Sequence, residues 1–426
     1  MSASMPGNPD GRRQAERLAV LSSCCGMLGE VTLTDSAVIL LFAAALGAGE
    51  MLTLLTTAVL PFMNGLCVIP MAFLVTRIGV RRLIYFACGF AALAYGFAAA
   101  SPWFGTAAMP VLLGSILCFS FCLTGFIAGW FPLVDSFLLP ERRTLFFGRM
   151  RFAHQLTAAG FLFLTGLLIG PKPPVSMLQG ILAAAGLIFI GRAAAIARMP
   201  QFPLPERKVR SFREGLQEAV SNRKLAGFSL YIFLLNIAAC GTVPLVLLYL
   251  KKGLHAPDNL TMLVSSCVLT GMLLGYIGTN PLQRKIGLRW TFLLIHGTLA
   301  AINVLLFFLR GSGWCVYGAA ALLLTVYSFM LAASATLCSS EMLKLVSRGN
   351  KVMSMAFCSA LTSGGMGLSR LFSSLLLGSG ILSAEWFIGN SRFCQYQTLL
   401  LLNAVLFVLA GFFLLLVPAV QHKNNT

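Results

Sequence analysis

Two acidic residues, Glu30 and Asp35, lie inside a long apolar stretch near the start of the chain. A charged side chain is costly inside a membrane, where it usually faces a cavity or a partner of opposite charge. A carboxyl shielded from water also takes up a proton more readily, so Glu30, near the middle of the stretch, is a candidate for proton coupling or for binding a substrate amine. The alternative is a structural carboxyl satisfied by neighbouring helices, or a stretch that begins later and leaves Glu30 near an interface.

One arginine, Arg370, lies in a late apolar stretch, three residues after a glycine-rich segment at 364–367. With a rise of ~1.5 Å per residue, Arg370 and Asp35 have similar depths in their helices. An ion pair between them would form an outer gate, or the arginine would hold an anionic substrate group. The alternative is an arginine that extends to the outer interface. Asn64 and Asn236 are polar residues in other apolar stretches and are further candidates for a binding pocket.

Motifs for enzymatic chemistry are not found in the sequence. The twelve cysteines lie mostly in apolar stretches, and neither a CxxC pair nor a His/Cys cluster has the spacing of a zinc site. HExxH, GxSxG and P-loop motifs are also absent. We therefore predict no catalytic residue, no metal and no cofactor, and we do not expect an enzyme.

The composition is that of a membrane protein, because 58% of the residues are hydrophobic and only 10% are charged. Soluble domains carry roughly 25% charged residues. Segments long enough to cross ~30 Å of hydrocarbon can be marked off along the chain. We predict an all-α membrane protein with twelve transmembrane helices, at 18–45, 51–76, 83–100, 107–131, 152–170, 178–198, 226–250, 260–282, 290–309, 314–338, 352–378 and 398–418.

The net charge of +18 arises from basic residues in the short loops between these segments. With both ends of the chain in the cytoplasm, 24 of the 31 Lys and Arg residues fall on the cytoplasmic side and five on the opposite side. This asymmetry follows the positive-inside rule and explains the charge better than nucleic-acid binding. The polar, basic start of the chain does not resemble a cleavable signal. We expect a multi-pass protein of the cell (inner or plasma) membrane with cytoplasmic termini.

A polar, basic stretch divides the chain into two nearly equal parts. The expected organisation is a cytoplasmic tail at 1–17, a six-helix bundle at 18–198, a cytoplasmic linker at 199–225 and a second six-helix bundle at 226–420. The linker has apolar residues at helical spacing, which predicts an amphipathic helix on the inner membrane surface. A calmodulin-binding helix is the alternative. The apolar positions are Val209, Phe212, Leu216 and Val220.

The two parts share landmarks at a nearly constant offset. Gly79 and Gly287 each lie in a basic turn after the second span of their half and are 208 residues apart. Asp135 and Glu341 each follow the fourth span and are 206 residues apart. The offset indicates two parallel six-helix repeats, related by an axis along the membrane normal.

These features resemble the major facilitator superfamily of secondary transporters. The family's loop between the second and third spans reads roughly Gly-x-Leu-Ala-Asp-Arg-x-Gly-Arg-Arg, whereas Thr76 stands here in place of the Asp. In the family this loop joins the two halves when the inner side is closed. The resemblance implies that Arg77 or Arg81 pairs with Asp135, and Lys285 or Arg289 with Glu341. Simple anchoring of the loop by basic residues is the alternative. The positions that match the motif are Leu74, Arg77, Gly79, Arg81 and Arg82.

The resemblance implies a secondary transporter that moves a small solute by alternating access, with a proton as the candidate coupling ion in symport or antiport. Its expected partners are the solute and the lipid bilayer, not nucleic acid, and a monomer is expected. A non-transporting sensor or interaction protein of the same fold is the first alternative. An integral membrane enzyme is the second.

Overall fold

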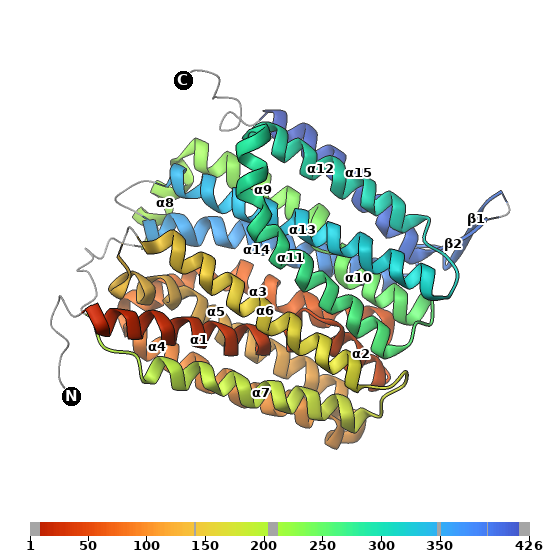
Figure 1. The fold of residues 1–426 in the computed structure, drawn as a ribbon, viewed down its shortest axis with the longest axis horizontal. Coiled ribbons are helices and arrows are strands. Elements are labelled where there is room, and N and C mark those ends of the chain that lie inside the picture. Colours follow the sequence, from red (N-terminus) through yellow and green to blue (C-terminus); the bar gives the residue numbers. More distant parts are fainter. Residues whose placement is uncertain (1–8, 140–141, 203–211, 347–350, 390, 417–426) are drawn as a thin grey trace.

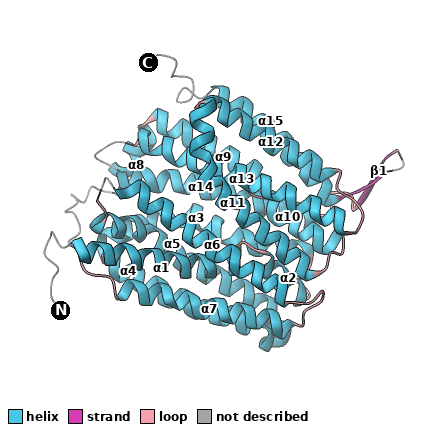
Figure 2. Cartoon of the chain, viewed as in Figure 1, coloured by secondary structure: helices cyan, strands magenta, loops and turns pink. Residues whose placement is uncertain are grey.

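The computed structural model describes residues 9–139, 142–202, 212–346, 351–389 and 391–416. It is a bundle of long helices that run in similar directions, with one two-stranded hairpin (Figures 1 and 2). We call the end of the bundle from which both termini leave the termini side, and the opposite end the hairpin side. The elements are α1 (Pro9–Thr34), α2 (Ala37–Ala45), α3 (Glu50–Ile78), α4 (Val80–Ala100), η1 (Ser101–Ala107), α5 (Ala108–Phe137), α6 (Arg143–Leu168), α7 (Val175–Ala197), α8 (Phe212–Ser221), α9 (Arg223–Ala239), α10 (Thr242–Leu248), η3 (Tyr249–Gly253), α11 (Asp258–Ile286), α12 (Leu288–Phe307), α13 (Trp314–Leu345), α14 (Lys351–Gly378), β1 (Glu385–Ile388), β2 (Ser391–Cys394) and α15 (Gln395–Leu416).

Eight helical segments in the described part are long and apolar enough to cross a membrane, or nine if the bent pair α1–α2 is one span. One of these segments, Val80–Phe137, runs through α4, η1 and α5. Inside η1 the backbone of Gly105 is not helical, with φ of +57°. The lengths and apolar composition of these segments define a multi-pass membrane protein.

Two of the predicted spans are broken rather than continuous. The first bends by 40° between α1 and α2, where Ser36 begins the new helix by accepting a hydrogen bond from the backbone N–H of Val38 (3.3 Å). The predicted span 226–250 is divided into α9 and α10 at Cys240 and Gly241. Hydropathy detects apolar length but not local backbone direction, so the sequence analysis missed both breaks.

Helix α1 begins at Pro9, before the apolar stretch that was predicted to begin near residue 18. Its first turns are polar, which is why hydropathy excluded them. An ion pair of 3.0 Å joins Glu16 of this helix to Arg142 at the start of α6. The helix therefore extends beyond its apolar part and contacts a neighbouring loop.

The two glycine turns are formed as the sequence predicted. Gly79 ends α3 with φ of +94°, and Gly287 ends α11 with φ of +80°. Glycine reaches such positive φ values without the steric cost of a Cβ atom. The two helices that these turns end are both 29 residues long, and their first residues, Glu50 and Asp258, lie 208 positions apart.

Helices from the two halves of the sequence pack directly on one another, α3 along α14 and α6 along α11. A Cβ atom on Gly65 of α3 would lie 2.6 Å from the backbone of Gly364 in α14, so the two helices approach at their backbones. Small residues allow helices to approach this closely within a membrane.

The predicted amphipathic helix corresponds to α8, which contacts α9 and α14. Its buried residues are Gly215 and Ala219, whereas Val220 is exposed, so its inner face is rotated from the predicted one. Phe212 packs edge-on against Phe73 of α3, with ring centroids 5.4 Å apart. Val209 lies outside the described residues.

The β1–β2 hairpin between α14 and α15 was not predicted. Trp386 of β1 stacks on Phe393 of β2, and Phe393 in turn stacks on Phe307 at the end of α12 (4.5 Å between centroids). The guanidinium of Arg310 lies 3.9 Å from the centroid of the Phe393 ring. This aromatic stack fixes the hairpin to the second half of the bundle.

Candidate functional site

Asp35 and Arg370, which the sequence analysis placed at similar depths, form an ion pair of 2.7 Å. Asp35 lies at the break between α1 and α2, and Arg370 lies in α14. The Arg370 side chain is only 7% exposed, whereas that of Asp35 is 48% exposed. A buried cation from one half of the chain is therefore neutralised by a partly accessible carboxylate from the other half.

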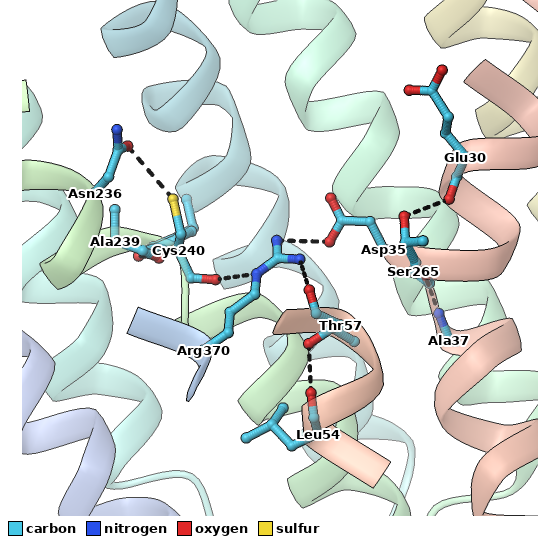
Figure 3. A network of polar contacts seen from close by, with 12 residues as sticks. Glu30, Asp35, Ala37, Leu54, Thr57, Asn236, Ala239, Cys240, Ser265 and Arg370 are labelled. Atoms are coloured by element: carbon cyan, nitrogen blue, oxygen red, sulfur yellow. Dashed lines mark hydrogen bonds and ion pairs between the residues drawn. The ribbon is translucent and has the colours of Figure 1, made fainter. Parts of the chain in front are cut away.

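Arg370 uses the rest of its guanidinium group on backbone carbonyls (Figure 3). Its Nε donates to the carbonyl of Cys240 (3.0 Å), between α9 and α10. Its Nη1 donates to the carbonyl of Thr57 (2.9 Å) in α3. All three nitrogens of the group thus have a partner, which is the arrangement that a planar, five-donor guanidinium can satisfy and a lysine cannot.

Glu30 does not share this site. Its side chain points away from Asp35 (Figure 3) and forms an ion pair with Arg192 of α7. The Arg192 side chain is 4% exposed and that of Glu30 is 21% exposed. The carboxyl that the sequence presented as isolated therefore has a counter-charge within its own half of the chain.

Arg192 is the site residue that the sequence analysis missed. Its guanidinium carbon lies 4.1 Å from the ring centroid of Phe126 and 5.3 Å from that of Phe189, and both aromatic faces attract the cation. A Cβ atom on Gly26 of α1 would overlap the guanidinium group, so glycine leaves the room that Arg192 occupies. The available signal was an arginine inside one apolar stretch and a glutamate inside another.

The two candidate asparagines lie in different places. Asn64 of α3 accepts a hydrogen bond from Thr124 of α5 (2.6 Å). Asn236 of α9 donates to the carbonyl of Thr362 (3.3 Å) and accepts from the thiol of Cys240 (3.5 Å). Asn236 is therefore connected through Cys240 to the Arg370 site, while Asn64 belongs to the first half of the chain.

The predicted pairs in the glycine-turn loops are not those that the structure forms. Asp135 pairs with Arg143, and Glu341 pairs with Lys344. Each acid thus has a cation from its own loop or helix. Such near neighbours reach the carboxylate at little cost in chain entropy, whereas a pair between distant loops must first bring those loops together.

The basic residues of these loops have other positions. Arg81 donates to the carbonyls of Met199 (3.2 Å) and Pro200 (2.7 Å), so it fixes the end of α7. Arg77 lies 4.9 Å from the centre of the Phe73 ring. The remaining three, Arg82, Lys285 and Arg289, are exposed.

Hydrogen bonds between the two halves, among the residues that the structure describes, lie in the part of the bundle nearer the hairpin side. Besides the contacts of Arg370, the backbone N–H of Ala37 donates to Ser265 (3.1 Å), and Ser374 donates to the carbonyl of Met51 (2.7 Å). Other polar contacts of this set join Ser266 to Ala159, Gln155 to Leu269, Gln395 to Glu50, Lys252 to Ala48 and Asp258 to Pro171. The halves are joined at this level by polar contacts.

Within the described residues, no group of three or more His, Cys, Asp or Glu side chains could hold a metal ion.

No family model matches the sequence, and no curated protein matches it. Solved structures, by contrast, match over nearly the whole length. A mutant of the nucleoside transporter NupG has a TM-score of 0.73 at 13% identity and covers 94% of this chain and 99% of its own. A bacterial homologue of the lysosomal transporter Spinster, in an inward-facing state, has a TM-score of 0.66 at 13% identity, with 97% and 98% of the two chains covered. FucP, in an outward conformation, has a TM-score of 0.62 at 14% identity, with 97% and 99% covered. The chain therefore has the fold of the major facilitator superfamily transporters.

Proposed function

We propose that the protein is a secondary transporter that moves a small solute across the membrane by alternating access between its two halves. The observation that carries the proposal is the Asp35–Arg370 ion pair, which joins the halves near the hairpin side. Arg370 is buried, whereas the Asp35 carboxylate is partly accessible to water. When the pair separates, the carboxylate is therefore hydrated and not left unpaired in an apolar environment. The fold shared with solved transporters supports the same conclusion.

In this proposal the chain crosses the membrane twelve times, as two parallel six-helix repeats. The pairs α1–α2 and α9–α10 would each be one broken span, and α4 and α5 would be separate spans joined by η1. The matching lengths and spacing of α3 and α11 support the repeat, as do the two glycine turns that follow them. The domain limits of 18–198 and 226–420, the linker at 199–225 and the cytoplasmic position of both termini belong to the same proposal, which makes the hairpin side the outer side.

The transported solute is proposed to be uncharged or zwitterionic. The two ion pairs Glu30–Arg192 and Asp35–Arg370 are internally neutral. A solute with a large net charge would need an uncompensated protein charge of opposite sign to offset its desolvation. Neither pair provides such an uncompensated charge.

The test is uptake by the purified protein in liposomes. The panel contains nucleosides, because NupG is a nucleoside transporter, together with sugars, amino acids, organic anions and lipophilic cations. Saturable uptake of one class, competed by the unlabelled solute, is the expected result. Binding of a panel member without uptake would instead indicate a sensor, and absence of uptake for every class would refute transport of these solutes.

Two sets of variants assign the roles of the ion pairs. The single reversals Asp35→Arg and Arg370→Asp are each expected to reduce uptake at least tenfold, and the double reversal is expected to recover part of it. Glu30→Gln is expected to abolish the dependence of uptake on a proton gradient. Proton-dependent uptake that persists in Glu30→Gln would exclude Glu30 as the coupling group, without affecting the assignment of Asp35.

A further inference from the structure

Two backbone carbonyls near the Asp35–Arg370 site lack a donor within their own helix. A proline inside a helix has no N–H, so the carbonyl four residues earlier loses its hydrogen-bond donor. Pro61 in α3 has this effect on the carbonyl of Thr57. Cys240 caps the end of α9, before Gly241 begins α10, and a carbonyl at the end of a helix has no intrahelical donor. An unpaired backbone carbonyl costs several kcal/mol inside a membrane, so each of these needs another donor.

Arg370 supplies that donor to both carbonyls. Its Nη1 binds the carbonyl of Thr57 and its Nε that of Cys240, while its third nitrogen binds Asp35 (Figure 3). The carbonyl of Thr57 is free because of Pro61, and that of Cys240 is free because α9 ends there. One buried side chain therefore completes the backbone hydrogen bonding of both helices.

The two carbonyls differ in which half of the chain they belong to. Cys240 lies in the same half as Arg370, and further bonds hold it there. Ser369 of α14 donates to the carbonyl of Ile237 (2.7 Å), and Tyr327 of α13 donates to that of Ala239 (2.6 Å). These bonds fix the break between α9 and α10 against its own half. The bonds of Arg370 to Thr57 and Asp35, by contrast, cross between the halves.

We propose that Arg370 is a latch that closes the hairpin side by completing the proline-broken helix α3 of the opposite half. The inference rests on the proposed alternating-access function. When the halves separate, Arg370 keeps the carbonyl of Cys240 and releases Thr57 and Asp35 together. The freed carbonyl of Thr57 then takes its hydrogen bond from water entering the opening. Pro61 is thus part of the latch, because it keeps the Thr57 carbonyl available for Arg370 alone.

The latch is tested by restoring the missing N–H. In Pro61→Ala the new N–H can donate to the carbonyl of Thr57 and compete with Arg370. Pro70→Ala is the matched control, since it changes a second proline of the same helix, and the carbonyl it affects belongs to the exposed Leu66. Both variants gain helix propensity, so neither is expected to impair folding.

The measurement is the distance between spin labels on exposed loops at the hairpin side, one on Lys172 and one on Ser312. Labels on genetically encoded ketone side chains leave the twelve native cysteines unchanged. Double electron–electron resonance in lipid nanodiscs then gives the ratio of long to short distances. Loss of one charge-assisted hydrogen bond is expected to raise that ratio about tenfold.

The expected pattern has three parts. Pro61→Ala and Arg370→Gln each raise the ratio, and Pro70→Ala leaves it unchanged. The double variant Pro61→Ala with Arg370→Gln has the ratio of Arg370→Gln alone, because the competing partner is already absent. Arg370→Lys also raises the ratio, because one ammonium group cannot reproduce the planar fork that reaches three acceptors.

The latch is overturned if Pro61→Ala has the wild-type ratio, or if Pro70→Ala raises the ratio as much as Pro61→Ala does. Should Arg370→Gln fail to fold, the two proline variants decide the question between them. Failure of the proposed function gives a different result. Wild-type protein that takes up no solute refutes transport, but the distances are measured without solute and still report the latch.

Discussion

Replacement of Glu30 by glutamine is expected to destabilise the first half of the bundle, because it leaves the Arg192 cation buried without a counter-charge. Removal of one partner from a buried ion pair typically costs about 3–5 kcal/mol. Since the Glu30 side chain keeps 21% exposure, we expect the lower end, about 3 kcal/mol. For a unit of roughly 150–250 residues this corresponds to a fall in Tm of about 6–12 °C.

The assay is thermal unfolding of the purified protein in detergent, followed by intrinsic fluorescence. Two further variants show whether the loss arises from the unpaired charge. Glu30→Gln combined with Arg192→Met removes both charges, so it is expected to unfold at a higher temperature than Glu30→Gln alone. Glu16→Gln is the matched control, because its partner Arg142 is 38% exposed and such pairs contribute about 1 kcal/mol or less.

Two outcomes would refute this reasoning. One is a Tm of Glu30→Gln no lower than that of the Glu16→Gln control. The other is a double variant that unfolds at a temperature no higher than Glu30→Gln alone, since removal of the Arg192 cation would then relieve nothing.

Three further predictions concern packing. Gly26→Ala places a methyl group against the Arg192 guanidinium and is expected to lower the free energy of unfolding by about 1–3 kcal/mol. Gly89→Ala, whose methyl group meets open space, is expected to leave Tm unchanged or slightly raised. Equal Tm values for the two variants would contradict the contact between Gly26 and Arg192. In Gly65→Val the new Cβ would lie 2.6 Å from the backbone of Gly364, so the side chain pushes α3 and α14 apart. The distances between the spin labels at the hairpin side are expected to lengthen. Unchanged distances would show that the packing of these two helices does not set the separation of the halves. Trp386→Ala removes the stack on Phe393 and is expected to make the hairpin more susceptible to protease added from the hairpin side. Cleavage at the wild-type rate would show that the stack does not hold the hairpin in place.

The Glu30–Arg192 and Asp35–Arg370 pairs have different physical roles, although both join a carboxylate to a buried arginine. The first lies within one half of the chain, so motion of the halves relative to each other leaves it intact. The second crosses between the halves and must break when they separate. We therefore expect substitutions in the first pair to change stability most, and those in the second to change the balance between conformations.

The depth of polar groups along each helix was predictable from the sequence. Counting along the apolar stretches placed Asp35 and Arg370 at one level, where the structure joins them. The two glycine turns were equally predictable, because Gly79 and Gly287 lie between apolar helices where only a residue tolerant of positive φ fits. Both predictions depend on distance along the chain, which the sequence states directly.

The direction in which a side chain points around its helix was not predictable. Glu30 and Asp35 are five residues apart, and only the packed structure shows that one contacts α7 and the other α14. The hairpin and the use of Arg370 as a donor to the carbonyls of Thr57 and Cys240 depend in the same way on which helices become neighbours.

The sequence by itself therefore determined a multi-pass helical membrane protein and the depth of its charged groups, because the thickness of the bilayer imposes a length on every span. The tertiary structure alone decided which charges meet. Partners at one depth are selected by the rotation and packing of whole helices, and no single span encodes that arrangement.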